Sequence, residues 1–538
     1  MLKVIVTALT LVHGEGLPSK APDAVGMSAS RLESIDRVVQ RGITAGGYPG
    51  ASVVVGRKGA AVWEKGFGKL SWSPVSEAVT ADRTIYDIAS LSKVVGTTTA
   101  VMVLYDEKKV DLDAPVFRYL PAFSGGGRDQ VTVRDLLTHR SGLPAGRDLW
   151  RRARSPQEAR NMVVETPLSY HPGQTYVYSD LGADVLGMIV EVVSGERLDT
   201  FLNRRVFGPL GMHDTFYRPP DSVRYRTAPT AVTPPRGYPL RGEVHDENAY
   251  ALGGIAGHAG LFSTAADLSI FAQMMLNGGT YNGVEIVSDS TVSLFIRRAA
   301  GHRALGWDTA DGDYGSGRYL TERAYGHTGF TGTSIWIDPD REMFVVLLTN
   351  RVHASRAQRP AKIIADVRSD LSDAAVLAVL DGPTPVLAMP DAFRADGQVG
   401  WTRPKPVAVR CSKATRARTA RSRSSRRRVK CSTAKRKISA SRSAKNSKSS
   451  RAVAAARARR AAASKSALKA RRTSASKSAV KRGRASASKS ALKAKRTAAS
   501  KAVARKKRAV SNKSPKTKRT AFWSYPGSTG NAFAIQLG

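Results

Sequence analysis

Cysteine is almost absent from this chain. Its two cysteines, Cys411 and Cys431, both lie in the last quarter of the sequence. Residues 1–404 can therefore hold neither a disulfide nor a metal site with thiolate ligands. Long apolar runs are missing too. No stretch approaches the length of about 18 residues that a membrane-spanning helix needs, so no transmembrane segment is predicted.

Acidic residues are missing from residues 405–538, which contain 42 Lys and Arg and no Asp or Glu. The other 404 residues contain 43 basic and 43 acidic residues, so the net charge of +42 belongs to the tail. We therefore predict a folded body and a tail of Ala, Ser, Lys and Arg. The tail should be disordered when free, because it buries too little apolar surface to offset its chain entropy.

The tail repeats itself with a period of 12 residues, marked by Lys465, Lys477, Lys489 and Lys501. Three interpretations stay open. The tail is an arm that binds nucleic acid or another polyanion without reading base sequence, or a solvated and self-repelling extension, or the product of a frameshift or misplaced gene boundary. Residues 381–404 are expected to link it to the body.

Residues 1–21 are a signal peptide or another N-terminal extension. The sequence Met1-Leu2-Lys3, followed by apolar residues 4–12, is typical of a signal peptide, but no clear cleavage site follows. A buried N-terminal helix or strand is the alternative. With a signal the protein is expected in the periplasm or outside the cell, and without one in the cytoplasm.

The sequence of the body predicts an α+β fold with an antiparallel sheet flanked by helices. Segments 51–56 and 60–66, and later 333–337 and 343–350, are rich in β-forming residues and are joined by short turns, which predicts two hairpins. Helical spacing occurs at 31–43, 94–105, 133–139, 156–164, 180–194, 265–276 and 361–380. Strands at both ends, helices between them and hairpins rather than crossovers are typical of this fold class.

Ser90 and Lys93 are spaced to share one face at the start of a helix. The segment that follows, 94–105, is apolar nearly all round and is predicted to be buried. A lysine can take a serine proton only if burial or nearby positive charge lowers its pKa. The spacing alone says little, since the tail repeats it, as at Ser432 and Lys435. A capping serine beside a surface lysine is the alternative.

Two further polar segments add to this pair. Tyr178 stands just before a predicted helix and could supply a phenol or phenolate to a shared proton network. His327-Thr328-Gly329 directly precedes a predicted strand, and polar residues on an edge strand can line a substrate while backbone N–H groups bind an oxyanion. The alternatives are a core tyrosine and a strand-end histidine with a satisfied hydrogen bond.

The ordered motifs Ser90-x-x-Lys93, Tyr178-Ser179-Asp180 and His327-Thr328-Gly329 make residues 22–380 resemble a known family. This is the family of serine β-lactamases and penicillin-recognising enzymes. The likeness is closest to the class C-like branch, with its D-alanyl-D-alanine carboxypeptidases, D-aminopeptidases and esterases. Segments 136–143 and 257–264 support the resemblance, which implies a β-lactamase/transpeptidase-like fold with a mostly helical subdomain.

The resemblance also implies roles. Ser90 is then the acylated nucleophile, and Lys93 and Tyr178 share the general base and acid work, in an order that stays open. The backbone N–H groups of Ser90 and Phe330 form the oxyanion hole. The substrate is lined by Asp180, His327, Thr328 and Gly329. No metal or organic cofactor is implied, and the spacings of His139, His245 with Asp246, and His258 match no zinc signature.

Two departures from the family pattern bear on the substrate. Many β-lactamases have Lys-Thr-Gly in place of His327-Thr328-Gly329, so this chain lacks that permanent cation. The second motif usually ends in Asn, whereas Asp180 is acidic and repels an anionic substrate unless it pairs with Lys93. Both departures favour an esterase or peptidase over an efficient antibiotic hydrolase.

The sequence therefore predicts a serine hydrolase that acts through an acyl-enzyme on esters, D-amino-acid peptides or β-lactams. The alternative is a protein that binds peptidoglycan peptides or penicillin without turnover and carries a polyanion-binding tail. Its oligomeric state is open.

Overall fold

The computed structural model describes residues 16–312, 315–353, 360–381 and 385–402. They belong to the first of two compact units, residues 1–410, and the second unit, 411–538, lies outside the described residues. The apolar start at residues 4–12 and the repeats of the basic tail also lie outside them. The signal peptide, the disorder of the tail and its polyanion binding therefore stay predictions.

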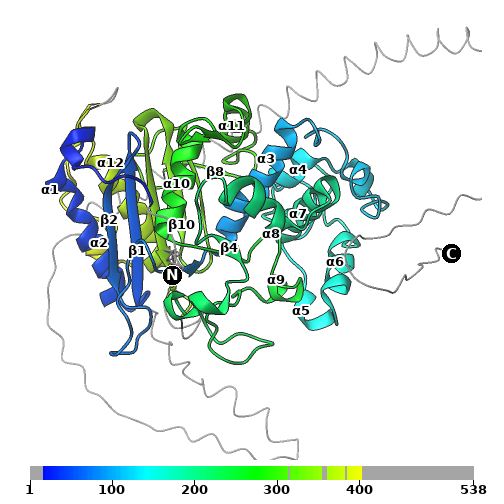
Figure 1. The fold of residues 1–538 in the computed structure, drawn as a ribbon, viewed down its shortest axis with the longest axis horizontal. Coiled ribbons are helices and arrows are strands. Elements are labelled where there is room, and N and C mark those ends of the chain that lie inside the picture. Colours follow the sequence, from blue (N-terminus) through cyan, green and yellow to red (C-terminus); the bar gives the residue numbers. More distant parts are fainter. Residues whose placement is uncertain (1–15, 313–314, 354–359, 382–384, 403–538) are drawn as a thin grey trace, which may run out of the picture. The chain divides into compact units, whose positions relative to one another are not determined.

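A six-stranded antiparallel sheet lies at the centre of the described unit (Figure 1). Its strands are β1 (Gly50–Arg57), β2 (Ala60–Gly68), β8 (Asp308–Thr309), β9 (Tyr325–Thr328), β10 (Ser334–Asp338) and β11 (Met343–Thr349), in the order β2-β1-β11-β10-β9-β8. Val54 of β1 and Ile335 of β10 both pair with Val346 of β11. Strands from the two ends of the body are therefore neighbours, which confirms the predicted α+β class.

The central strand β11 is apolar along its whole length because helices cover both faces of the sheet. Met343, Val345 and Leu347 belong to one core, and Phe344 and Val346 belong to the other. Successive side chains of a strand point to opposite faces. A continuous apolar run is therefore what a doubly covered strand needs.

Both predicted hairpins are present. Lys58 and Gly59 join β1 to β2 with φ angles of 47° and 80°, the two positive values that a tight two-residue turn requires. A short 3₁₀ turn, Pro339–Arg341, joins β10 to β11, and Arg341 pairs with Asp338 across it at 2.9 Å.

One face of the sheet is covered by α1 (Ala29–Leu32), α2 (Ser34–Thr44) and α12 (Lys362–Leu377), which lie on the same side in Figure 1. The predicted linker, 381–404, adds to this layer. Its helix α13 (Arg394–Gly397) packs against α2 and α12. Trp401 is only 4% exposed, and its indole N–H donates to Asp366 Oδ2 at 2.8 Å. The described part of this segment is therefore core rather than a free connection.

The opposite face is covered by α10 (Ala265–Leu276), with a mostly helical region beyond it (Figure 1). That region contains α3 (Thr99–Asp106), α4 (Val133–Leu137), α5 (Leu149–Arg152), α6 (Pro156–Val164), α7 (Asp180–Ser194), α8 (Leu198–Leu202), α9 (Glu247–Ala251) and α11 (Asp289–Ile296). The helix predicted at 94–105 begins instead with a π-helical stretch, Ser92–Thr98, before α3.

Two small sheets were not predicted. The first joins β3 (Tyr86–Asp87), β5 (Leu261–Ser263) and β4 (Phe216–Tyr217), and the second joins β6 (Thr280–Tyr281) and β7 (Val284–Glu285). Strands of two or three residues are too short for a period of two to be read from sequence. The first sheet matters most, because β3 leads directly into Ser90.

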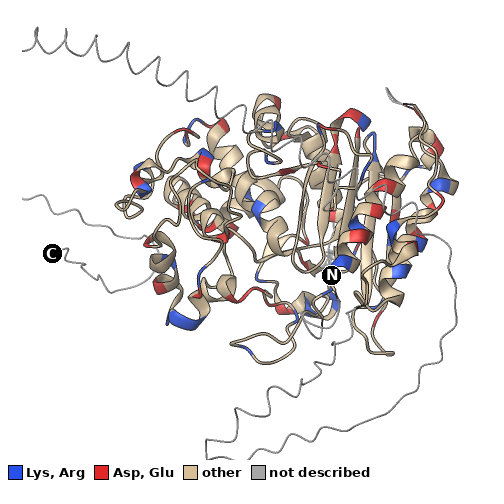
Figure 2. Ribbon diagram, turned by 180° about the vertical axis from the view of Figure 1, so that it is seen from behind, with Lys and Arg blue, Asp and Glu red and all other residues tan. Residues whose placement is uncertain are grey.

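Charged residues of both signs are spread over the helices and loops of the described unit (Figure 2). This agrees with the formal neutrality of residues 1–404. No helix in the described ranges is both long and apolar enough to cross a membrane.

Replacing Trp401 by Ala should destabilise the protein by about 3 kcal/mol, the usual cost of emptying a large buried aromatic site. Chemical denaturation of the full chain measures this change. Val399→Ala is the matched control, because Val399 is 74% exposed and its loss should be close to neutral. Equal effects of the two substitutions would show that residues 385–402 do not belong to the core.

Candidate active site

Ser90 lies on a tight turn at the entrance to a buried helical stretch. The turn is a 3₁₀ helix, Ala89–Leu91, that follows β3 and leads into Ser92–Thr98. Ala89 has a φ of 49°, which a residue with a Cβ adopts only when its surroundings enforce it. The Asp87 carboxylate accepts the Ala89 N–H at 2.8 Å and the His245 N–H at 2.7 Å. Asp87 therefore holds the turn that presents Ser90.

Lys93 is buried, and its ammonium group has three partners. Nζ lies 3.1 Å from Ser90 Oγ, 2.9 Å from the His258 carbonyl oxygen and 2.8 Å from Asp180 Oδ1. An ammonium group has three N–H donors, so this set of partners satisfies it fully. The structure thus brings together the predicted Ser90 and Lys93, and it pairs Asp180 with Lys93 as the sequence allowed.

Lys93 keeps its proton in this arrangement. Burial lowers the pKa of Lys93, but the Asp180 carboxylate and the Tyr178 hydroxyl raise it by more, so the pKa lies above its ordinary value. For Asp180, burial raises the pKa, but the charges of Lys93 and His258 lower it by more. The condition under which Lys93 could act as a base, a lowered pKa, is therefore not met before substrate binds.

Tyr178 lies among cations and rings. Its ring centroid is 5.0 Å from Lys93 Nζ and 5.9 Å from the guanidinium carbon of Arg303. The His139 ring lies 4.6 Å away on the segment 136–143 that supported the family resemblance. His139 Nδ1 accepts the N–H of Ser179, the residue whose hydroxyl caps α7. His139 therefore helps to fix the position of Tyr178 at the start of that helix.

The third motif lies at the end of a strand, β9, with Gly329 just after it. His327 and Thr328 end β9, which is the second strand from the edge rather than the edge itself, although β8 covers only Tyr325 and Gly326. His327 is buried, with Nδ1 2.8 Å from the Thr328 carbonyl oxygen. Burial is the main cause that lowers the pKa of His327 to about 4, so the ring is neutral at pH 7.

The loop after β9 is tied to the turn that carries Ser90. The Thr333 hydroxyl donates to the Ile88 carbonyl at 3.0 Å, and the Thr331 hydroxyl donates to the Asp87 carbonyl at 2.8 Å. A Cβ on Gly329 would lie only 2.5 Å from the Ile88 oxygen. Glycine at this position therefore lets the two backbones approach closely.

A cavity of about 690 Å³ opens over these groups. Six predicted site residues line it: Ser90, Tyr178, His327, Thr328, Gly329 and Phe330. Lys93 and Asp180 do not line it; Lys93 contacts Ser90 Oγ from the buried side. Phe330 is 50% exposed, and its ring stacks on His245 at 5.8 Å.

The cavity also contains two arginines that the sequence analysis did not single out. Arg351 lies 5.0 Å over the Phe330 ring, and Arg368 of α12 donates to the carbonyl oxygens of Gly329 (2.6 Å) and Thr333 (2.9 Å). Neither forms an ion pair with a carboxylate of the described residues. Burial, and next the charge of Arg351, lower the pKa of Arg368 to about 9.

No sequence spacing links these arginines to the motifs, because they come from the end of β11 and from the closing helix. A third arginine in the cavity, Arg303, pairs with Asp308 and is buried. The positive charge in this cavity therefore comes from arginines that lie outside the three sequence motifs.

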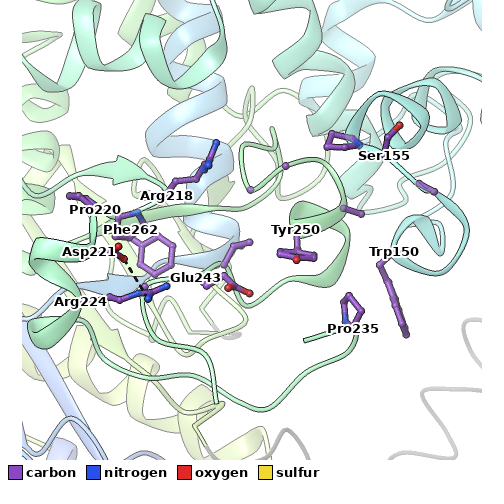
Figure 3. Close-up of a pocket in the computed structure, with 18 of the residues that line it drawn as sticks. Trp150, Ser155, Arg218, Pro220, Asp221, Arg224, Pro235, Glu243, Tyr250 and Phe262 are labelled. Atoms are coloured by element: carbon purple, nitrogen blue, oxygen red, sulfur yellow. Dashed lines mark ion pairs between the residues drawn. The ribbon is translucent and has the colours of Figure 1, made fainter. Parts of the chain in front are cut away.

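A second cavity, of about 800 Å³, lies between the loops around α5, α9 and residues 218–244 (Figure 3). Its lining includes Trp150, Arg218 and Tyr250, and Asp221 pairs with Arg224 at 3.4 Å. Its serine, Ser155, caps α6 by accepting the Glu158 N–H. Although it is the larger cavity, it contains none of the predicted catalytic groups. The chemistry, rather than the volume, places the candidate active site at Ser90.

The family model described as Beta-lactamase matches residues 35–368. The chain belongs to the Beta-lactamase family. It is 34% identical over 368 residues to a protein of Bacillus subtilis (strain 168) named "N-acetylmuramyl-L-alanine amidase", covering 61% of this chain and 82% of the relative. It is 33% identical over 377 residues to a Salmonella schwarzengrund protein named "Putative D-alanyl-D-alanine carboxypeptidase", covering 63% of this chain and 87% of the relative.

Solved structures of Beta-lactamase-like proteins share the fold. A penicillin-binding protein homologue from Caulobacter crescentus is 21% identical with a TM-score of 0.52, over 66% of this chain and 99% of that one. A class C β-lactamase mutant is 19% identical with a TM-score of 0.52, over 65% of this chain and 97% of that one. These confirm the predicted β-lactamase/transpeptidase-like fold, and the family is one of serine hydrolases with several activities.

Activity should fall below about pH 6 as Asp87 takes up a proton. Burial raises the pKa of Asp87 to about 6, since it outweighs the N–H groups of His245 and Ala89 that lower it. Above this pH the carboxylate is charged and holds both N–H groups; below it, the Ser90 turn loosens. The dependence of kcat/KM on pH measures this for a neutral nitrophenyl ester.

Asp87→Asn should abolish the fall of kcat/KM below about pH 6 (the acid limb), because an amide does not titrate. The variant should also be slower than the unchanged protein at every pH. The exposed Asp391→Asn is the control and should keep the limb. An acid limb that persists unchanged in Asp87→Asn would assign it to another group.

Proposed function

We propose that this protein is a serine hydrolase that forms an acyl-enzyme through Ser90. The observation that carries the proposal is that Ser90 and Tyr178 line one cavity and both lie close to the buried Lys93 Nζ, although Tyr178 is far from the other two in sequence. Such a hydroxyl, ammonium and phenol can exchange a proton without a metal.

In the proposed reaction, Ser90 Oγ attacks the substrate carbonyl carbon while Tyr178 takes the hydroxyl proton. We assign the first proton to Tyr178, because Lys93 holds its own proton. The Tyr178 ring lies 5.0 Å from Lys93 Nζ and 5.9 Å from the guanidinium carbon of Arg303. The backbone N–H groups of Ser90 and Phe330 stabilise the oxyanion. Tyr178 then returns the proton to the leaving group, the acyl–Ser90 bond remains, and water hydrolyses it by the same proton route.

For the substrate, we propose D-amino-acid peptides with a free carboxylate in preference to neutral esters. Arg351 and Arg368 line the cavity beside Phe330, without a carboxylate partner among the described residues. A carboxylate can bind such guanidinium groups by paired hydrogen bonds. The name of the Salmonella relative, a putative D-alanyl-D-alanine carboxypeptidase, supports the proposal, and the name of the Bacillus relative supports amide hydrolysis only.

These arginines offset the missing lysine of the third motif, so the lack of a cation at His327 no longer argues against anionic substrates. Asp180 is neutralised by Lys93 and need not repel them. Esters and β-lactams remain possible substrates of the same nucleophile, and a location outside the cytoplasm remains a prediction.

A fluorophosphonate probe should label the full chain at one residue, and Ser90→Ala should remove the label. Hydrolysis of a neutral nitrophenyl ester should fall by at least about a thousandfold in the same variant, as for other lost nucleophiles. The exposed Ser73→Ala is the control and should keep both label and rate. Equal ester hydrolysis by Ser90→Ala and the unchanged protein would instead favour binding without turnover.

Arg351→Gln should reduce kcat/KM for a 3-carboxyphenyl ester by about tenfold or more relative to the phenyl ester of the same acyl group. One hydrogen bond to a charged group is worth roughly 1.5–3 kcal/mol, which corresponds to such a change. Arg151→Gln, on an exposed helix, should leave the ratio unaltered. If Arg351→Gln left the ratio of the two kcat/KM values unchanged, the proposed preference for a carboxylate would be wrong, whereas the proposal of a serine hydrolase would still stand.

A further inference from the structure

His258 lies next to Lys93, and each of its nitrogen and oxygen atoms has a hydrogen-bond partner. Its ring is buried, with Nδ1 2.7 Å from Asp184 Oδ1 and Nε2 3.1 Å from Asp246 Oδ1. Its backbone N–H donates to Asp184 Oδ1 at 3.3 Å, and its carbonyl accepts Lys93 Nζ at 2.9 Å. The same residue thus joins two carboxylates to the ammonium group that contacts Ser90.

The backbone around His258 has little freedom to move. The Thr97 hydroxyl donates to the Gly257 carbonyl at 2.6 Å. A Cβ on Gly257 would press into the backbone of Ala183 in α7, so this glycine allows a close approach between the segment and the helix. A change at the His258 ring should therefore be passed to its carbonyl oxygen and to Lys93.

Three carboxylates surround the His258 ring and Lys93, and a positive ring reduces this excess of negative charge. Asp180 and Asp184 lie four residues apart on α7, and Asp246 caps α9 by accepting the N–H groups of Asn248 and Ala249 at 2.9 Å each. Lys93 alone cannot neutralise three carboxylates. A neutral imidazole donates one hydrogen bond, whereas an imidazolium donates two and can bind Asp184 and Asp246 together.

We propose that His258 is a positioning residue whose imidazolium is the permanent counter-ion of Asp184 and Asp246, so that Lys93 is held by Asp180 and the His258 carbonyl at Ser90. This inference rests on the proposed hydrolase function. It assigns His258 no contact with substrate. It makes the charge on one buried ring a condition for the alignment of Lys93.

The direction of the electrostatics agrees with this geometry. Burial lowers the pKa of His258, but the carboxylates of Asp184, Asp246 and Asp180 raise it by more, to well above the usual value. His258 in turn lowers the pKa of Asp246, although burial raises it. Other titratable groups that act on this cluster are Lys93, Tyr178, His245, Tyr217 and Asp87.

The charge on the ring can be measured directly by NMR on the full chain with histidine-selective isotope labelling. The chain has nine histidines, and the spectrum of His258→Gln identifies the signal of His258. The ring should give an imidazolium signal throughout pH 6–8. A neutral ring at pH 7 would overturn the proposal, whatever the enzyme hydrolyses.

Kinetics then tests whether that charge positions Lys93. With a neutral nitrophenyl ester, His258→Gln should lower kcat by about tenfold or more at little change in KM, because Lys93 acts on the chemical step. The exposed His213→Gln is the matched control and should retain the unchanged kcat. A kcat for His258→Gln equal to that of the control would overturn the positioning role.

A pH readout separates this role from general loss of structure. Asp246→Asn should lower the titration midpoint of the His258 ring, and kcat should fall with rising pH at the same midpoint. In Asp184→Asn, which removes the shorter contact, the ring's titration midpoint and the fall in kcat should again coincide, at a lower pH than in Asp246→Asn. A kcat that does not change across the titration midpoint of the His258 ring in either variant would overturn the proposal. Failure of the hydrolase function is distinguishable, since the unchanged protein would then not hydrolyse the ester at all.

Discussion

The ion pair between the buried Lys93 and the half-buried Asp180 is the contact on which the site depends. An ammonium group shielded from water is costly unless all three of its N–H donors are satisfied. Here the donors are satisfied by three separate parts of the chain: the turn of Ser90, the start of α7 and the segment before β5. The need to satisfy one charge therefore fixes three segments relative to Ser90.

A second constraint ties the sheet to this arrangement. The loop between β9 and β10 is bonded through two threonine hydroxyls to the carbonyls of Asp87 and Ile88, immediately before Ser90. The loop that carries Phe330 and the turn that carries Ser90 are thus held together at one short piece of backbone. Arg368 adds a third link, from α12 to the same loop. Preorganisation of this kind reduces the rearrangement needed during reaction.

Local signals explain why much of the fold could be predicted from sequence. Helices α6, α7 and α10 begin and end where expected, because Ser155, Ser179 and Thr264 cap their first turns and Gly195 ends α7 in a left-handed conformation. Small strands such as β3 and β5 were missed, since their pairing depends on partners far along the chain. The same is true of Arg351 and Arg368, whose place beside Phe330 is set by the sheet and the closing helix. From sequence, one could say only that Asp180 repels an anionic substrate unless it pairs with Lys93, because that pairing depends on where the Lys93 side chain points.

The packing of α13 against α2 and α12, and of Trp401 against α12, has a practical consequence. The family match ends at residue 368, inside α12, and a domain boundary drawn from motifs alone falls near residue 380. A truncated version prepared for expression with either limit would lose the indole that binds Asp366 and the Arg394 that pairs with Asp370 and Asp373. With the limit near residue 380, Asp370 and Asp373 would stay on α12 without Arg394, and the limit at residue 368 would cut α12 itself. A stable fragment of the body should therefore extend through residue 402.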